Sequence, residues 1–232
     1  MPRALALLAF LTFPLPALAQ ATATSETFTG TAPVSLDYLA YLPDGYADND
    51  DTYPLILFLH GAGERGDDLE VVKKHGPPKE IENGRKIDAV VIAPQCPAND
   101  YWHATELHAL VDHLIERYRI DEKRLYLTGL SMGGYGTWDL AVRLGNRVAA
   151  AVPICGGGKS FLARELAGTP LWVFHGEKDP VVPLRESLEM VQAVRRRGGD
   201  AKLTVYPDVG HESWTPAYAD DALYEWLMRQ TK

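Results

Sequence analysis

Cysteine is scarce in this chain, which has only Cys96 and Cys155 among its 232 residues. A fold stabilised by disulfides needs more cysteines, and a structural zinc site needs cysteine and histidine ligands at short spacings that are not found here. The sequence therefore predicts a fold held together by an apolar core. We expect no metal ion and no organic cofactor.

Positive charge is also in short supply. Lysine and arginine total 23 against 31 aspartate and glutamate, which gives a formal net charge of -8 with histidine neutral. The one short basic cluster, residues 195–197, falls at the end of a predicted helix. A nucleic-acid-binding surface needs a positive patch that neutralises phosphates, so we expect no nucleic-acid partner.

Long apolar runs are absent after the N-terminal segment. No later stretch approaches the roughly 20 apolar residues that span a bilayer, so no membrane span is expected in the mature protein. The N-terminal segment has Arg3, then an apolar run, then Ala-Leu-Ala at residues 17–19. This pattern predicts a signal peptide over residues 1–19, cleaved after Ala19, and a secreted or periplasmic protein.

The alternatives for this segment are a buried first helix or a membrane anchor. Pro14 and Pro16 interrupt its apolar run, and both alternatives require a longer continuous helix. We therefore expect residues 20–232 to form the mature protein, as a single catalytic domain.

Six short apolar runs in the mature chain are each followed by glycine or polar residues. They are too short for buried helices and too continuously apolar for strands with one exposed face, so they predict parallel strands buried on both faces. The runs cover residues 54–59, 89–93, 124–128, 148–154, 170–174 and 202–206.

Helical periodicity fills the gaps between these runs, so strands and helices alternate. The clearest helical segments cover residues 106–119, 135–143, 185–197 and 218–229, and residues 26–31 and 35–42 resemble an antiparallel pair at the sheet edge. The fold class is therefore α/β, with a doubly wound, mostly parallel sheet. The connection after Cys155 has room for one short helix, at residues 161–166, and not for a large lid domain.

The segment Gly129-Leu130-Ser131-Met132-Gly133 lies between a predicted strand and a predicted helix. A Gly-x-Ser-x-Gly sequence in this context is typical of a nucleophile elbow, a tight turn that exposes the serine hydroxyl. Ser131 is therefore the candidate nucleophile.

A serine nucleophile needs a base and an acid, which follow it along the chain in this kind of fold. Asp179 follows the strand at 170–174 and is the predicted acid. Glu177 is a rival acid, and the structural alternatives for Asp179 are a helix N-cap or an Asx turn before Pro180.

His211 follows the last predicted strand and is the predicted base. It would accept the serine proton, and the aspartate would fix its tautomer. The other histidines lie upstream of the predicted nucleophile or acid: His60, His75, His103, His108, His113 and His175.

The oxyanion formed by attack of the serine needs two preorganised N–H donors. One is the N–H of Met132, directly after the nucleophile. The second comes from the glycine-rich loop after the first central strand, where we assign Ala62 and keep Gly61 and Gly63 as alternatives.

These motifs resemble those of α/β-hydrolase carboxylesterases, the group that includes bacterial phospholipase/carboxylesterase, predicted peptidase and dienelactone-hydrolase-like proteins. The resemblance implies an α/β-hydrolase fold with Ser131, Asp179 and His211 as the triad. Dienelactone hydrolases carry a cysteine nucleophile, so Ser131 argues against their reaction. The matching stretches are residues 41–46, 59–66, 93–97, 129–136, 153–158 and 210–211.

The predicted function is a serine carboxylesterase that acts on short-chain or polysaccharide-attached acyl esters through an acyl-enzyme. A peptidase or amidase with the same triad and a catalytically silent binding protein are the alternatives. Trp102 and Trp214 are candidate walls of the substrate site, with core packing as the alternative for both.

Both cysteines are expected to be free thiols. They follow strands that have two other strands between them, which places them beyond the roughly 7 Å that a disulfide can bridge.

Overall fold

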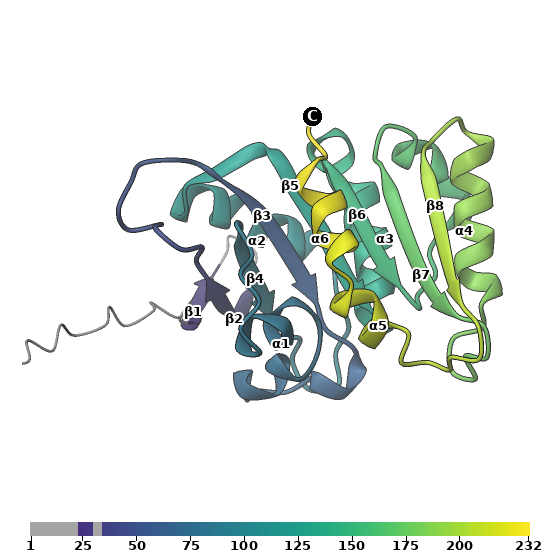
Figure 1. Cartoon of the computed structure of the whole chain (residues 1–232), viewed down its shortest axis with the longest axis horizontal. Helices are drawn as coiled ribbons and strands as arrows, with labels where there is room; N and C mark the ends of the chain where they lie inside the picture. Colours follow the sequence, from purple (N-terminus) through teal and green to yellow (C-terminus); the bar gives the residue numbers. More distant parts are fainter. Residues whose placement is uncertain (1–22, 30–33) are drawn as a thin grey trace, which may run out of the picture.

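The computed structural model describes residues 23–29 and 34–232, so the signal peptide predicted for residues 1–19 lies outside the described residues. Its centre is an eight-stranded sheet in the order β1-β2-β4-β3-β5-β6-β7-β8 (Figure 1). The strands are β1 (Ala23–Thr29), β2 (Ser35–Tyr41), β3 (Tyr53–Leu59), β4 (Val90–Pro94), β5 (Ile120–Leu130), β6 (Ala150–Ile154), β7 (Leu171–Gly176) and β8 (Ala201–Tyr206).

Strands β3 to β8 run parallel to one another, and β1 and β2 add an antiparallel edge next to β4. The doubly wound, mostly parallel sheet is thereby confirmed. The edge pair also matches the prediction from the sequence.

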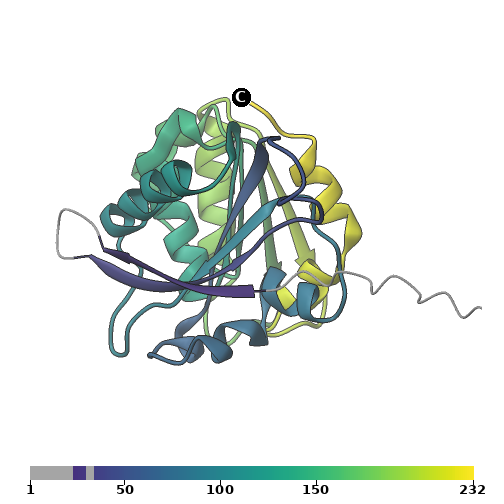
Figure 2. The ribbon, with the colours of Figure 1, turned by 90° about the vertical axis from the view of Figure 1, so that its left-hand side faces the viewer.

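Helices cover both faces of this sheet (Figure 2). Helices α2, α3 and α4 pack on one face, and α1, α5 and α6 pack on the other, each over its own apolar core. The α-helices are α1 (Gly76–Glu82), α2 (Ala104–Arg117), α3 (Met132–Leu144), α4 (Arg185–Arg196), α5 (Trp214–Ala219) and α6 (Asp221–Met228). The short 3₁₀ helices are η1 (Ala62–Glu64), η2 (Leu69–Lys74), η3 (Gly145–Arg147) and η4 (Ser160–Leu166).

The central strands are continuously apolar because both of their faces are covered. In β3, Leu55, Leu57 and Leu59 belong to one core, whereas Ile56 and Phe58 belong to the other. All seven residues of β3 are buried, as the predicted two-sided burial requires.

One helical prediction is wrong, and one helix was not predicted. The single helix predicted over residues 218–229 is wrong, because the chain breaks at Asp220, whose side chain caps α6 by accepting the N–H of Ala222 at 2.9 Å. Helix α1 was not predicted, although Pro77 and Pro78 occupy its first turn. Proline is tolerated in a first turn because the N–H groups there have no partner within the helix.

The connection between β6 and β7 contains only η4, so no large lid covers the sheet edge at this point. None of the helices in residues 23–29 and 34–232 is both long enough and apolar enough to cross a membrane. Cys96 and Cys155 are both buried and free, which confirms the prediction for the thiols.

The turn between β5 and α3 has the tightest backbone packing near the centre of the sheet. Ser131 has φ +52° and ψ -116°, a conformation that residues with a side chain rarely adopt. A Cβ atom at Gly133 would overlap the carbonyl oxygen of Leu59. Glycine at this position therefore lets the turn lie directly against the end of β3.

We predict that Gly133→Ala destabilises the protein by at least about 3 kcal/mol, because the added methyl group collides with backbone that cannot move aside. Urea unfolding followed by circular dichroism measures this loss. The matched control is Gly168→Ala, where the added atom meets only Asn146 Oδ1, at 3.5 Å, and the loss should stay below about 1 kcal/mol. Equal stability of the two variants would contradict the packing argument.

Candidate active site

Ser131 lies at the carboxyl end of β5, on the turn that leads into α3. Its N–H donates to the carbonyl oxygen of Ile154 at the end of β6, at 2.9 Å, and its own carbonyl accepts the N–H of Tyr135 at 3.1 Å. The turn is therefore fixed to the neighbouring strand on one side and to the helix on the other. This places the serine hydroxyl at the carboxyl ends of the parallel strands, where the loops that follow these strands meet.

The structure brings the three residues of the predicted triad together. His211 Nε2 lies 2.8 Å from Ser131 Oγ, and His211 Nδ1 lies 2.7 Å from Asp179 Oδ2. Because a carboxylate only accepts, Nδ1–H donates to Asp179, which leaves Nε2 to accept the hydroxyl proton of Ser131. The three side chains come from the segments that follow β5, β7 and β8.

The side chain of Asp179 is fully buried and well supplied with donors. Its Oδ1 accepts the backbone N–H groups of Val181 and Val182, at 2.8 and 2.9 Å. Burial opposes ionisation of this carboxyl group, but the hydrogen bonds from His211, Val182 and Val181 outweigh it and lower the pKa of Asp179. The acid is therefore ionised at neutral pH. Glu177, the rival acid, is exposed to solvent.

The glycine-rich loop lies directly against the nucleophile. A Cβ atom at Gly61 would lie 3.7 Å from the Cβ of Ser131, and the N–H of Gly61 is already taken, since it donates to Glu64 Oε2 at 3.1 Å. Ala62 begins the 3₁₀ turn η1, and Met132 begins α3, so the N–H of each stands at the start of a helical turn, where donors have no partner within the helix. Ala62 therefore fits the role of second oxyanion donor better than Gly61, because the N–H of Gly61 already donates to Glu64.

His60 holds this loop in place. Its Nδ1–H donates to the carbonyl of Gly61 at 2.6 Å, its Nε2 accepts the N–H of Cys96 at 2.9 Å, and its own carbonyl accepts the indole N–H of Trp102 at 3.0 Å. Burial lowers the pKa of His60 to about 4. The ring is therefore neutral at neutral pH, as this pattern of one donor and one acceptor requires.

A pocket of about 430 Å³ opens beside the nucleophile turn. Three aromatic rings and the side chain of Met132 form most of its wall. Tyr101 and Tyr135 are 65% and 38% exposed, respectively, so their rings face solvent at its mouth. The lining residues are Tyr101, Trp102, Met132, Tyr135, Gly136 and Asp139.

The two tryptophans predicted as walls of the substrate site lie in different places. Trp102 lines the pocket and packs edge-on against His60, with ring centroids 4.9 Å apart. Trp214 packs edge-on against His211, with centroids 5.2 Å apart, and also contacts the ring of His75. Trp214 therefore supports the ring of His211 and is not one of the residues that line this pocket. Tyr101 and Tyr135 were not singled out in the sequence, since only the folded chain places their rings beside Met132.

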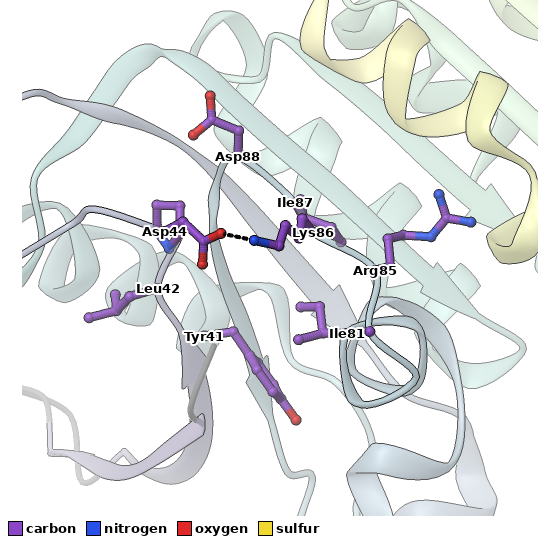
Figure 3. A pocket seen from close by; sticks show the side chains of 10 residues that line it. Tyr41, Leu42, Asp44, Ile81, Arg85, Lys86, Ile87 and Asp88 are labelled. Carbon is purple, nitrogen blue, oxygen red and sulfur yellow. Dashed lines mark hydrogen bonds and ion pairs between the residues drawn. The ribbon is translucent and has the colours of Figure 1, made fainter. Parts of the chain in front are cut away.

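A second pocket, of about 230 Å³, is separate from the triad (Figure 3). It lies where β2 ends and the chain enters β4, with Tyr41 on one side and Ile87 on the other, and Lys86 forms an ion pair with Asp44 across it. Because Tyr41 pairs with Val91 near the start of β4, this pocket is at the opposite end of the parallel strands from Ser131.

One potential ligand atom from each of Cys155, Asp179 and His211 lies within 4.8 Å of the others. Burial raises the pKa of the Cys155 thiol to about 12, so the thiol keeps its proton at neutral pH. A metal ion bound here would also break the hydrogen bond between His211 and Asp179. The arrangement therefore fits proton transfer better than metal binding.

A comparison with known protein families identifies the family of this chain. The profile of the Dienelactone hydrolase family matches residues 34–221. The chain belongs to the dienelactone hydrolase family. The resemblance noted in the sequence is thereby confirmed at the level of the family, and Ser131 stands at the elbow.

Two relatives with similar sequences are named as esterases. The chain is 28% identical over 169 residues to a probable feruloyl esterase C of Aspergillus terreus, covering 70% of this chain and 62% of that protein. It is 27% identical over 157 residues to a bifunctional acetylxylan esterase/xylanase, XynS20E, of Neocallimastix patriciarum, covering 63% of this chain and 22% of that protein. The chain thus spans less than two thirds of the length of either relative.

Among solved structures, one described as a thermostable esterase is 34% identical, with a TM-score of 0.79 over 90% of this chain and 63% of that one. Another, described as a ferulic acid esterase, is 18% identical, with a TM-score of 0.69 over 90% of this chain and 96% of that one. The chain therefore has the α/β-hydrolase fold.

The neutral His60 leads to a prediction about stability. The pKa of His60 is about 4 in the folded state and about 6.5 in the unfolded chain, so the unfolded chain binds more protons between these values. His60 should therefore cost up to about 3 kcal/mol of stability as the pH falls from 6.5 to 4. Urea unfolding at pH 7.0 and 4.5 should show a smaller loss between the two pH values for His60→Gln than for the parent protein. An equal loss in both would contradict the neutral buried histidine.

Proposed function

We propose that this chain is an exported serine carboxylesterase whose residues 20–232 form a single catalytic domain. The observation that carries the proposal is the chain of hydrogen bonds from Ser131 through His211 to Asp179, at 2.8 and 2.7 Å, on a strand-to-helix turn. A serine hydroxyl becomes a nucleophile when an imidazole accepts its proton and a carboxylate stabilises the resulting charge. An N-terminal signal peptide would direct the protein to the periplasm or out of the cell.

The proposed reaction has two steps. Ser131 Oγ attacks the ester carbonyl while its proton passes to His211 Nε2, and the N–H groups of Met132 and Ala62 stabilise the oxyanion. The alkoxide leaves with the proton from His211 and an acyl-enzyme remains. Water then attacks the acyl-enzyme through the same base, which releases the acid and restores Ser131.

The pocket beside Met132 supports esters with a bulky, planar acyl group. Its volume of about 430 Å³ exceeds what an acetyl group fills, and the rings of Tyr101, Trp102 and Tyr135 can stack on an aromatic acid. One relative is named a probable feruloyl esterase, and another is named a bifunctional acetylxylan esterase/xylanase. We therefore favour aromatic acyl groups attached to a polysaccharide, with acetyl esters as poorer substrates.

A peptidase or amidase with the same triad is the alternative enzyme. The sequence shows no separate feature that would bind a peptide substrate, so we rank ester hydrolysis above peptide hydrolysis. A catalytically silent binding protein is disfavoured, because Ser131 and His211 lie at hydrogen-bonding distance.

We predict that Ser131→Ala abolishes ester hydrolysis, with kcat/KM reduced at least about 10³-fold, because Ser131 supplies the hydroxyl that is hydrogen-bonded to His211 and forms the acyl-enzyme. The parent and the variant are compared on p-nitrophenyl acetate, butyrate and octanoate and on a peptide anilide. Ser35→Ala is the control, since the side chain of Ser35 is exposed at the first residue of β2.

Activity that survives in Ser131→Ala would contradict the assigned nucleophile. Turnover of the anilide and of no ester by the folded parent would transfer the assignment to an amidase.

The aromatic pocket leads to a prediction about substrate preference. Tyr135→Ala should lower kcat/KM for methyl ferulate about threefold to tenfold, since an aromatic stacking contact contributes about 0.5–1.5 kcal/mol, and should leave p-nitrophenyl acetate within about twofold. Phe161→Ala removes an aromatic ring that is 77% exposed and does not line the pocket, so it is the matched control. If both esters lose the same factor in Tyr135→Ala, the pocket does not bind the acyl group.

A further inference from the structure

His175 is a buried histidine for which the proposed reaction has no use. It lies at the end of β7, and its side chain is fully shielded from solvent. Its Nε2 lies 2.9 Å from the carbonyl oxygen of Val182 and 3.3 Å from Asp179 Oδ2. Its Nδ1 lies 2.7 Å from the hydroxyl of Ser187 on α4.

These neighbours determine where the proton of His175 is. Both oxygens near Nε2 can only accept, so Nε2 must carry a proton. Burial lowers the pKa of His175, so the ring is neutral at neutral pH and has that single proton. Nδ1 is then an acceptor, so the single proton of the Ser187 hydroxyl is shared between Nδ1, at 2.7 Å, and the carbonyl oxygen of Gly156, at 3.0 Å.

The ring closes a cycle of hydrogen bonds around the carboxylate. Val182 donates its N–H to Asp179 Oδ1, and its carbonyl accepts the Nε2–H of His175, which also faces Asp179 Oδ2. Asp179 Oδ2 therefore accepts a hydrogen bond from His211 Nδ1–H at 2.7 Å and also faces the Nε2–H of His175 at 3.3 Å, whose shorter contact is with the carbonyl of Val182. A carboxylate held at both oxygens in this way has little freedom to rotate.

We propose that His175 is a positioning residue, whose Nε2–H holds the carboxylate of Asp179 in the orientation that His211 requires, and that Ser187 sets the tautomer that makes this possible. The inference rests on the proposed function, because it assigns a role to His175 only if Asp179 orients the catalytic base.

The contact should also affect the charge that His211 experiences. The titratable groups that act on His175 are Asp179 and His211. The thiol of Cys155 lies within 4.8 Å of ligand atoms of both, and Glu186 is next to Ser187 on α4. A second N–H on Oδ2 disperses the negative charge of Asp179. Without it, Asp179 stabilises the imidazolium form of His211 more strongly, so a higher pH is needed to free the base.

The experiment compares His175→Asn with His175→Gln on p-nitrophenyl butyrate from pH 5 to 9. The glutamine amide nitrogen can reach the position of Nε2 and keep the donor, whereas the shorter asparagine cannot. We expect His175→Asn to lose about tenfold in kcat with KM within about twofold, and its acid limb to move up by about half a pH unit or more. His175→Gln should keep the acid limb of the parent and recover most of kcat.

Ser187→Ala tests the same idea without altering the ring. Loss of its hydroxyl frees His175 to place its proton on Nδ1, so the acid limb should move in the same direction by a smaller amount. This variant keeps the proposal testable if His175→Asn does not fold. His113→Asn is the matched control, since His113 packs on Phe28 at the β1 edge of the protein, and its kcat and acid limb should match the parent.

A folded His175→Asn with the kcat and acid limb of the parent would overturn the proposal. Equal losses of kcat in the asparagine and glutamine variants, with no movement of the acid limb, would also overturn it, because they would indicate packing alone. Ser131→Ala is measured in the same assay: if it keeps the activity, the proposed function fails, whereas if it is inactive and His175→Asn matches the parent, only the role of His175 fails.

Discussion

The close backbone contact between the β5–α3 turn and the ends of β3 and β6 is the constraint on which the site depends. Any Cβ atom at Gly133 would overlap the carbonyl of Leu59, and one at Gly134 would lie 2.5 Å from the carbonyl of Ile154. With no side chains in between, the turn lies directly on the two strands, and Ser131 is held at φ +52° with its hydroxyl at the sheet edge. The loops after β7 and β8 need only reach this fixed point to supply the acid and the base.

Burial opposes the charged form of both ionisable groups that organise the site, but the outcome differs between them. Asp179 remains ionised because backbone and imidazole N–H groups surround its carboxylate. His60, whose ring nitrogens contact the backbone of Gly61 and Cys96, loses its charge instead. In the proposed reaction, the charged Asp179 would support the imidazolium that forms on His211, and the neutral His60 would hold the glycine-rich loop without adding a competing positive charge.

The central strands and the proximity of Ser131, Asp179 and His211 could be predicted, because each leaves a local pattern in the sequence. The apolar runs are continuous since both faces of the sheet are covered, and the order of Ser131, Asp179 and His211 follows the order of the parallel strands. The break at Asp220 was missed because apolar periodicity continues through it. The partners of His175 could not be predicted, since Ser187 and Asp179 meet its ring only after the chain has folded. The pocket wall formed by Tyr101 and Tyr135 could not be predicted for the same reason, because one ring comes from the loop before α2 and the other from α3.

The most direct test of the account is covalent labelling of the protein with a fluorophosphonate, followed by intact mass and peptide mapping. Such a reagent reacts with a serine whose hydroxyl has been activated by a neighbouring base. The account predicts one adduct per chain, on Ser131, that is lost in Ser131→Ala and greatly slowed in His211→Gln. An adduct on another residue, or a folded protein that does not react, would contradict the claim that Ser131 is an activated nucleophile.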